Sequence, residues 1–386
     1  MPTKKKRVRK IAIVTGGRIE FGYVRPVIKA IEKNPDLDYE IIAANMHVLP
    51  EFGHTVDEIY KDKFKVGAAV HNTLAGYTHL TMVKSLGVFL TELPGIIERM
   101  APDFILVAGD RGEPLIAAMT GAHMYIPVAH IQAGELSGNI DGMTRHAITK
   151  YAHIHFAAND DAAKRLKKMG EQDFRILNVG APQLDEFVSG DVTDSKAIRQ
   201  RYHLPRNKKS ILLIQHSVTE EADLAEKQIA ESIKAVASLK LPTVIILNNS
   251  DAGSRHIREV IARYKNFKAR TFNHIPRPDY FGLLKTCDVL VGNSSSGIIE
   301  APLAKIPVVN IGNRQKGRLQ STNVINVGHS QLAIANAIKR ALSDKFRARA
   351  EKSLSVYGDG NSAKKIVSVL ATTPINKKLL VKELTY

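Results

Sequence analysis

Short apolar runs alternate along the chain with stretches of helical periodicity, and this alternation constrains the fold more than any other feature. A buried strand of a parallel sheet reads as a short run of β-branched and apolar residues, and such runs recur here with helical patterns between them. Strand and helix that alternate in this way are typical of parallel sheets covered by helices on both faces. The sequence therefore predicts an α/β protein.

The alternation occurs twice, which predicts two sheets. The expected strands of the first half are 10–15, 39–44, 104–108, 126–131, 154–157 and 174–179, and the clearest helices are 24–32, 81–100, 112–123, 144–152 and 160–169. After a polar stretch at 189–195, strands are expected at 211–215, 243–247, 268–272, 289–292 and 308–311. A chain of 386 residues suits two domains at about 150 residues each. We expect domains at 1–188 and 189–345, and a helical segment at 346–386 that packs back on the first domain.

Composition excludes several classes of protein. No uninterrupted apolar run approaches the roughly 18 to 20 residues that cross a bilayer, so we expect no membrane span. The apolar stretch at 11–14 is too short for a signal-peptide core, and the single cysteine, Cys287, permits no internal disulfide. These features favour the reducing cytoplasm.

The formal net charge of +17 suggests a polyanionic partner. Six basic residues, however, lie within the first ten positions, where a solvated tail is the simplest interpretation: Lys4, Lys5, Lys6, Arg7, Arg9 and Lys10. No helix-turn-helix, zinc-finger or RNP signature accompanies the charge. We therefore expect no nucleic-acid partner.

In open α/β sheets ligands bind beyond the carboxyl ends of the strands, so we expect the functional residues in the loops that follow strands. The first strand is followed by Gly16-Gly17-Arg18, where backbone N–H groups, a helix N-terminus and a guanidinium favour an anion such as phosphate. This is not a G-x-G-x-x-G dinucleotide fingerprint. A tight turn with a surface arginine is the alternative.

Polar residues also follow the third and fourth strands of the first half. Asp110 and Arg111 lie side by side after 104–108, and Asp110 could equally be a plain helix cap. The stretch from His130 to Glu135 leads into a helix on which Asp141 and Arg145 are four residues apart, hence on one face. Neither the acids nor the histidines have the spacing of a zinc motif.

The second half carries a Gly/Ser-rich loop, Gly292-Asn293-Ser294-Ser295-Ser296-Gly297, between a strand and a helix. Such a loop offers amides and hydroxyls to a diphosphate, and Glu300 could accept hydrogen bonds from a ribose. His216 and Asn249 follow two other strands, and Arg314 adds positive charge.

Taken together, these motifs resemble the UDP-N-acetylglucosamine 2-epimerase family, in its hydrolysing branch of the sialic and legionaminic acid type. The resemblance runs from about residue 11 to 317. It rests on Arg18, Gly109-Asp110-Arg111, His130-Ile131-x-x-Gly134-Glu135-x-Ser137-Gly138-x-Ile140-Asp141, Arg145-His146-Ala147-Ile148-Thr149-Lys150, Asp251-Ala252-Gly253, Gly292-Asn293-Ser294-Ser295 and Arg314-Gln315.

The resemblance implies two facing Rossmann-like domains with parallel sheets, the GT-B architecture, and no metal or other cofactor. It implies a UDP-sugar substrate, such as UDP-N-acetylglucosamine, that loses its C2 proton and UDP to give a glycal, which then adds water. The first domain would supply the acid–base residues, with Asp110 and Asp141 among them and Arg111 and Glu135 beside them. The second would bind the nucleotide. Nucleotide and diphosphate contacts would be Arg18, His216, Asn249, Ser294, Ser295, Glu300 and Arg314. A homodimer or homotetramer is expected.

Two positions depart from the family pattern. Gln132 stands where many hydrolysing members have Glu, and an amide cannot act as a general base. Either Glu135 takes that role, or Gln132 holds a different substituent, as on UDP- or GDP-linked N,N'-diacetylbacillosamine. Gly22 replaces a hydroxyl contact of some members.

Other functions remain open at this point. A non-hydrolysing 2-epimerase would return a UDP-sugar instead of free UDP. A glycosyltransferase of the same architecture would need an acceptor and would not exchange the C2 proton. A polyanion-binding protein is motivated only by the charge, and its binding would fall steeply with salt.

Overall fold

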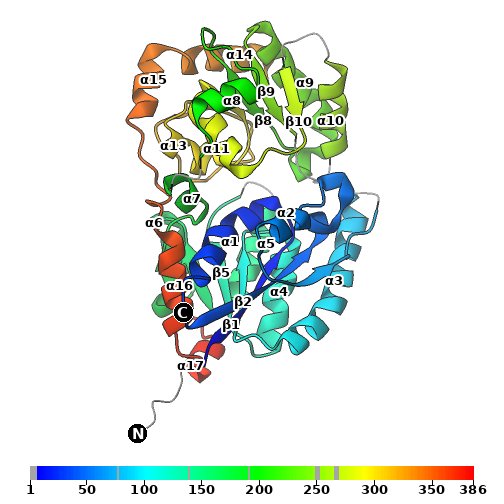
Figure 1. Cartoon of the computed structure of the whole chain (residues 1–386), viewed down its shortest axis with the longest axis vertical. Coiled ribbons are helices and arrows are strands. Elements are labelled where there is room, and N and C mark those ends of the chain that lie inside the picture. Colours follow the sequence, from blue (N-terminus) through cyan, green and yellow to red (C-terminus); the bar gives the residue numbers. More distant parts are fainter. Residues whose placement is uncertain (1–6, 76–77, 138–139, 190–191, 248–252, 265–268) are drawn as a thin grey trace. The chain divides into compact units, whose positions relative to one another are not determined.

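The structure is a computed structural model of the chain, and it describes all residues except 1–6, 76–77, 138–139, 190–191, 248–252 and 265–268. The chain divides into two compact units (Figure 1). The first comprises Met1–Glu135, Asp141–Glu186 and Tyr357–Tyr386, and the second comprises Leu136–Ile140 and Phe187–Val356. Each unit is built on one parallel sheet.

The sheet of the first unit has, in the described part of the chain, seven strands in the order β3-β2-β1-β4-β5-β6-β7. They are β1 (Arg9–Thr15), β2 (Leu37–Ala44), β3 (Val66–Val70), β4 (Phe104–Ala108), β5 (Val128–Ala133), β6 (Ile154–Ala157) and β7 (Ile176–Asn178), and every neighbouring pair is parallel. The helices of this unit are α1 (Arg18–Ile31), α2 (Val56–Lys61), α3 (His79–Met100), α4 (Gly112–His123), α5 (Ile140–Tyr151), α6 (Asp160–Lys168), α16 (Ser362–Thr372) and α17 (Lys377–Leu380). α5 begins with the last residue of the Leu136–Ile140 segment.

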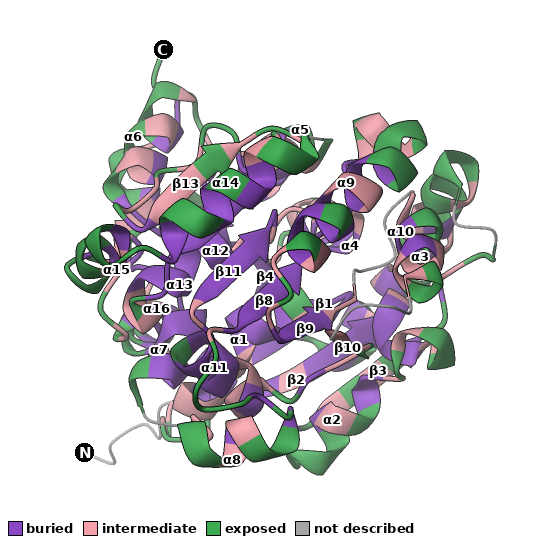
Figure 2. Cartoon of the chain, turned by 90° about the horizontal axis from the view of Figure 1, so that it is seen from above, coloured by how far each residue is buried: buried purple, intermediate pink, exposed green. Residues whose placement is uncertain are grey.

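Helices cover both faces of this sheet because successive strand side chains point to opposite faces. In β1, Ile11 and Ile13 face the core layer under α1 and α16, whereas Ala12 and Val14 face the layer under α3 and α4. All four are fully buried. Figure 2 shows the central strands as the most buried part of the chain and the exposed residues on outward helix faces.

The second sheet has six described strands in the order β10-β9-β8-β11-β12-β13, all parallel. They are β8 (Ile211–Ile214), β9 (Thr243–Ile246), β10 (Ala269–Phe272), β11 (Val289–Gly292), β12 (Val308–Ile311) and β13 (Val324–Val327). The helices are α8 (Ser195–Arg201), α9 (Ala225–Ser238), α10 (Ser254–Arg263), α11 (Arg277–Thr286), α12 (Ser296–Ile299), α13 (Ala301–Ala304), α14 (Gln331–Ala341) and α15 (Asp344–Glu351), while α7 (Gln183–Val188) spans the junction between the units. The prediction of two parallel, Rossmann-like sheets is confirmed.

Several predicted boundaries are wrong. The first helix begins at Arg18 instead of residue 24, because Gly17 is already its N-cap. β5 begins at Val128 instead of 126, and β7 begins at Ile176 because Asp173–Arg175 form a 3₁₀ turn. The predicted start of β10 at residue 268 lies outside the described residues.

Two edge strands, β3 and β13, were not predicted from the sequence. Both are only partly buried, and small or polar residues such as Gly67 and Asn326 interrupt their apolar pattern. An edge strand has one unpaired side and often lacks the continuous apolar run of a central strand.

Arg9 and Lys10 are held more firmly than residues of a solvated tail would be. Arg9 belongs to β1 and donates hydrogen bonds to the carbonyls of Leu370 and Thr373, both at 2.8 Å. Lys10 forms an ion pair with Glu40. The solvated-tail interpretation is therefore wrong for Arg9 and Lys10, while Lys4, Lys5 and Lys6 lie outside the described residues.

One described helix, α3, is long and apolar enough to cross a membrane by length and composition alone, with a mean hydropathy of 1.4 over that stretch. Lys84 and Glu92 interrupt its sequence. Its Phe89, Leu93 and Ile97 are fully buried in the first unit's core.

Candidate functional site

The candidate residues fall into one group in each unit, and both groups follow carboxyl ends of strands. In the first unit, the turn after β1 is built from Gly16 and Gly17, which allow close packing. A Cβ on Gly16 would come within 2.9 Å of Glu113 Oε2, and one on Gly17 would overlap the side chain of Met46. Arg18 is the first residue of α1 and is half-buried. The turn thus places Arg18 at the first position of a helix that the sequence predicted to begin only at residue 24.

The turn after β4 carries Asp110 and Arg111. Gly109 has φ +81°, a left-handed conformation that favours glycine, and its carbonyl accepts a hydrogen bond of 2.7 Å from Nε2 of His130. Burial lowers the pKa of His130 to about 3, so the imidazole is neutral. Arg111 is the N-cap of α4. Asp110 is therefore not itself the N-cap, contrary to the simpler interpretation.

Arg145 of α5 connects the ends of β4 and β5. Its guanidinium forms an ion pair with Asp110 and donates a hydrogen bond of 2.5 Å to the carbonyl of Gln132. Only 2% of the Arg145 side chain is exposed. A buried arginine fixed by two partners holds the carboxylate of Asp110 in one place. Sequence spacing placed Arg145 on a face with Asp141 but did not predict its pairing with Asp110.

Gln132 has an unusual backbone. Its φ is +65°, and the register between β5 and β6 shifts between Ile131 and Ala133. Left-handed conformations are uncommon for residues other than glycine, and bulges of this kind redirect a side chain. The amide, which is 2% exposed, donates to Oε1 of Gln183 at 3.4 Å. A local irregularity in the sheet thus sets the direction of this side chain.

Glu135 and Asp141 have different surroundings. The buried carboxylate of Glu135 accepts hydrogen bonds from Nδ2 of Asn159, the N-cap of α6, and from the Tyr357 hydroxyl at 3.5 Å. Asp141 is half-buried in the first turn of α5, four residues before Arg145. The contacts of Glu135 tie β5 to α6 and to residue 357.

In the second unit, the ends of β8 and β11 are joined by Asn293. Its side chain accepts from the His216 N–H at 2.7 Å and donates to the His216 carbonyl at 2.9 Å. Gly292 precedes it with φ +128°, and a Cβ there would overlap the carbonyl oxygen of Ile214. Only glycine allows the two strand ends to approach this closely.

The loop after β12 packs against Asn293. Arg314 Nη1 and Gln315 Nε2 donate to the Asn293 carbonyl at 3.3 and 2.9 Å. Four buried polar atoms near these strand ends have no hydrogen-bond partner among the described residues: Gln215 Oε1, Ser217 Oγ, Arg314 Nε and Gln315 Oε1. Buried polar groups are nearly always paired in folded proteins, so such a group of atoms is typical of a site that a polar ligand completes.

The Gly/Ser-rich loop leads into the short helices α12 and α13. Ser294 Oγ accepts from the Ser296 N–H at 3.3 Å, Ser295 is the N-cap of α12, and the Tyr280 hydroxyl lies against Ser296 Oγ. Glu300 is buried, and this burial raises its pKa, although the charge of Arg277 opposes the rise. Asn249 lies outside the described residues.

Sequence reasoning gave Glu20, Glu113 and Asn293 no role of their own, although Asn293 lies in the Gly/Ser-rich loop and all three are buried at strand ends. Glu20 had a usable signal, since an acid three residues after an N-cap often reaches back to the backbone before the helix. Here its Oε2 accepts from the Gly16 N–H at 2.5 Å. For Glu113 and Asn293 we find no comparable local signal.

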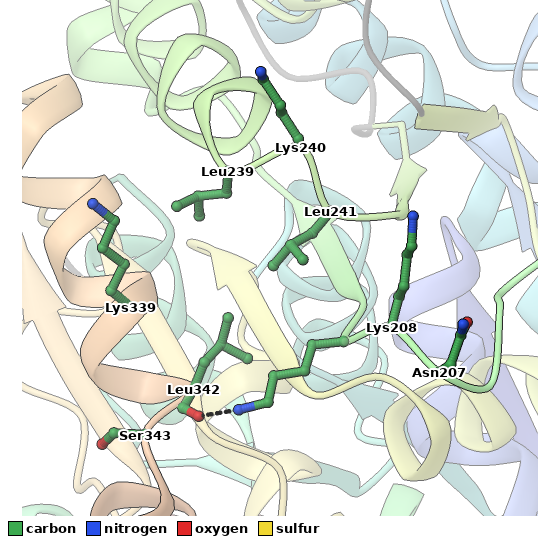
Figure 3. A pocket seen from close by; sticks show the side chains of 9 residues that line it. Asn207, Lys208, Leu239, Lys240, Leu241, Lys339, Leu342 and Ser343 are labelled. Carbon is green, nitrogen blue, oxygen red and sulfur yellow. Dashed lines mark hydrogen bonds between the residues drawn. The ribbon is translucent and has the colours of Figure 1, made fainter.

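A cavity of about 610 Å³ in the second unit lies elsewhere. Its lining residues lie just before β8, just before β9 and at the C-terminal end of α14. The cavity is therefore at the amino ends of the strands, whereas the candidate residues follow the carboxyl ends. Figure 3 shows Leu239, Leu241 and Leu342 converging on it, with the dashed hydrogen bond from Lys209 to the Leu342 carbonyl, while Lys208 and Lys240 point away. The cavity contains none of the predicted site residues.

Comparison with known proteins gives a consistent result. The sequence model of UDP-N-acetylglucosamine 2-epimerase matches residues 29–371. The chain is 38% identical to the UDP-N,N'-diacetylbacillosamine 2-epimerase (hydrolyzing) of Legionella pneumophila over 97% of this chain and 99% of the relative. It is 33% identical to the UDP-N-acetylglucosamine 2-epimerase of Neisseria meningitidis over 88% of this chain and 90% of the relative.

Solved structures share the fold. A crystal structure of UDP-GlcNAc 2-epimerase from Neisseria meningitidis bound to UDP-GlcNAc superposes with a TM-score of 0.81 at 20% identity, over 94% of this chain and 99% of that one. Such epimerase structures have the GT-B class of fold, which confirms the predicted fold class. The family match and the identity to full-length relatives show that this chain belongs to the UDP-N-acetylglucosamine 2-epimerase family.

Proposed function

We propose that the protein is a hydrolysing 2-epimerase of a UDP-linked N-acetylated hexosamine. The observation that carries this proposal is the ion pair of Asp110 with buried Arg145, which holds an ionised carboxylate at the strand ends where the family resemblance expects acid–base chemistry. The similarity over nearly full length to a relative named as hydrolyzing supports the hydrolytic outcome.

The reaction needs two proton transfers at C2, the loss of one proton from water and one leaving group. A base removes the C2 proton, the electron pair forms the C1–C2 double bond, and the C1–O bond to UDP breaks. Water then adds its oxygen to C1 and gives one of its protons to a base, while a proton enters C2 from the opposite face, which yields the free C2 epimer. Asp110 and Asp141 are the carboxyl groups that we assign to these proton transfers. Arg111 lies beside Asp110 at the start of α4, where its charge would support the developing negative charge.

Gln132 stands where many hydrolysing members have Glu. This proposal has two candidates for the role of that glutamate, Gln132 itself and Glu135. Glu135 already accepts hydrogen bonds from Asn159 and Tyr357, which favours a role in positioning the end of β5. Gln132 is an amide in a backbone conformation that redirects its side chain, which favours contact with a neutral substituent of the sugar.

The nucleotide would bind in the second unit through Arg314, Ser294, Ser295, His216 and Glu300. Arg18 and Asn249 are the other two nucleotide contacts that the family resemblance implies. The unpaired polar atoms at the ends of β8 and β12 support a polar ligand at this edge. A homodimer or homotetramer in the cytoplasm completes the proposal, and light scattering coupled to gel filtration tests the oligomeric state.

Two sugars are candidate substrates. UDP-N-acetylglucosamine is the simplest member of the class. UDP-N,N'-diacetylbacillosamine is favoured by Gln132 and by the name of the relative with 38% identity. We propose the diacetylated sugar as the better substrate, because a neutral amide can hydrogen-bond an additional acetamido group in both directions.

A proton NMR time course in heavy water tests the proposal with both UDP-sugars. We expect free UDP and a free C2-epimeric sugar that carries deuterium at C2, formed faster from the diacetylated substrate. An epimeric UDP-sugar without free UDP would instead indicate a non-hydrolysing enzyme. Retention of the C2 proton during UDP release would contradict the elimination mechanism.

A further inference from the structure

Two buried carboxyl side chains at the first unit's strand ends have no role in the reaction just proposed. Glu20 lies in the first turn of α1, which follows β1, and Glu113 lies in the first turn of α4, which follows β4. The strands β1 and β4 are direct neighbours in the sheet. Glu20 is 1% exposed and Glu113 is 3% exposed, so both carboxyl groups are removed from water.

Few groups compensate these two carboxyls. Glu20 Oε2 accepts from the Gly16 N–H at 2.5 Å, and Glu113 Oε1 accepts from Asn45 Nδ2 at 2.6 Å. The second oxygen of Glu20 is buried and has no partner among the described residues. Within that part of the chain, neither carboxyl forms an ion pair. Two buried negative charges without a paired cation are costly, so one of the two groups should be neutral.

The environment of Glu20 favours its protonated form. Burial and the nearby charge of Glu113 raise the pKa of Glu20 to about 8, and Asp110 adds to the rise. The charge of Arg111 and the Gly16 hydrogen bond oppose it. Glu20 is thus the member of the pair that holds the proton at pH 7.

The pair also bridges two turns. Glu113 Oε2 would be 2.9 Å from a Cβ on Gly16, so it packs directly against the turn that leads to Arg18. The Cγ of Glu20 would be 3.8 Å from a Cβ on Gly109, so Glu20 packs against the turn that leads to Asp110. Each of the two glutamate side chains therefore packs against the turn that follows the other strand.

We propose that Glu20 and Glu113 form a carboxyl pair that carries one proton at neutral pH and positions the turns bearing Arg18 and Asp110. The inference rests on the proposed function, because it assigns these turns to the substrate. Loss of the proton would leave two adjacent negative charges, whose repulsion would separate the turns. Glu20 and Glu113 are positioning residues, since each packs against a turn and neither is assigned a contact with the substrate.

The pH profile of turnover tests the pair. For the unchanged enzyme we expect kcat/KM to fall above about pH 8, by about tenfold for each further pH unit, as for loss of a single proton. Glu20→Gln and Glu113→Gln each leave one carboxyl, so the pair cannot hold two negative charges in either variant at any pH. Both variants should keep most of their activity at pH 7 and lose this decline. A purely structural role would leave the profile unchanged, and that result would overturn the proposal.

Glu32→Gln is the matched control. Glu32 follows α1 at the end opposite to Glu20 and accepts a hydrogen bond of 2.7 Å from the Tyr39 hydroxyl. Its variant should show the same alkaline decline as the unchanged enzyme. Loss of the decline in Glu32→Gln as well would assign it to a general effect of removing charge from α1.

Carbon-13 NMR of glutamate carboxyls separates this inference from the proposed function, because it needs no substrate. We expect one carboxyl resonance that titrates between about pH 7 and 9, vanishes in Glu20→Gln and moves to lower pH in Glu113→Gln. Its absence from the unchanged protein would overturn the inference even if the enzyme turns over. If the resonance is present but the protein accepts neither UDP-sugar, the carboxyl pair is supported and the proposed substrates are refuted.

Discussion

Arg145 of α5 forms an ion pair with Asp110 at the end of β4, across 35 positions of sequence. The same guanidinium holds the Gln132 carbonyl, so one buried cation connects the ends of two neighbouring strands. This relationship orients the carboxylate that we assign to proton transfer, and it sets the expectations for the variants below.

Replacement of Arg145 should affect both stability and turnover. Arg145→Ala leaves Asp110 without its paired cation, and breaking a buried pair typically costs about 3 to 5 kcal/mol. We expect a loss of unfolding free energy in that range and a large fall in kcat/KM, measured by urea denaturation and UDP release. Lys234→Ala removes an exposed partner of Glu231 and should cost less than about 1 kcal/mol. Equal small effects in both variants would contradict a positioning role for Arg145.

Substitution of the two candidate acid–base residues should affect turnover without affecting UDP binding. Asp110→Asn and Asp141→Asn keep side-chain size but cannot exchange protons in the required way, so we expect no turnover and nearly unchanged affinity for UDP by calorimetry. Arg314→Ala and Ser294→Ala should show the reverse pattern, with weaker UDP binding. Normal turnover in either asparagine variant would remove that residue from the mechanism.

Gln132 should control substrate preference. Gln132→Glu restores the carboxylate common in hydrolysing members and should raise kcat/KM for UDP-N-acetylglucosamine relative to the diacetylated sugar by about tenfold, equivalent to about 1.4 kcal/mol. Gln132→Gly is the control, because glycine suits φ +65° but offers no amide. It should lose activity on both sugars while remaining folded. An unchanged preference in Gln132→Glu would mean that this side chain does not contact the distinguishing substituent.

Gly292 should tolerate no side chain. A Cβ there overlaps the Ile214 carbonyl, and φ is +128°, so Gly292→Ala should cost more than about 1 kcal/mol and abolish UDP binding. Gly328→Ala offers a comparison in the same unit, because a Cβ there meets nothing within 4 Å. Thermal melting of the two variants should differ clearly. A Gly292→Ala protein that melts like Gly328→Ala would disprove the close approach of β8 and β11.

Low pH should lower the stability of the first unit, because Glu171 becomes protonated. Burial alone would raise its pKa, but His155 and Lys382 hydrogen-bond its carboxylate and lower the pKa to about 2. Because the folded pKa lies below the ordinary value of 4.5, this group stabilises the fold above pH 4.5, and the stabilisation is lost as the pH falls toward 2. Melting temperatures from pH 7 to pH 2.5 should fall less steeply for Glu171→Gln. An identical slope would exclude Glu171 as a source of acid sensitivity.

Much of the site could be read from local sequence. Gly16-Gly17-Arg18 predicted a turn before a helix, because glycines and a following amphipathic stretch act over a few residues. The positions of Asp110 and Ser294 after buried strands followed from the rule that parallel strands end at one edge. Interactions between distant positions could not be derived in this way, since several partners satisfy the same local pattern. Glu113 against Gly16, and Asn293 against His216, are examples.

The sequence by itself determined the α/β class, the two parallel sheets and the strand ends that carry the polar residues, because hydrophobic periodicity and turn chemistry are local properties. Only the tertiary structure decided that Arg145 pairs with Asp110, that the backbone of Gln132 is left-handed and that Glu20 and Glu113 are both buried beside Gly16. These features depend on which strands become neighbours, and on the low polarity that surrounds a charge once the core has closed.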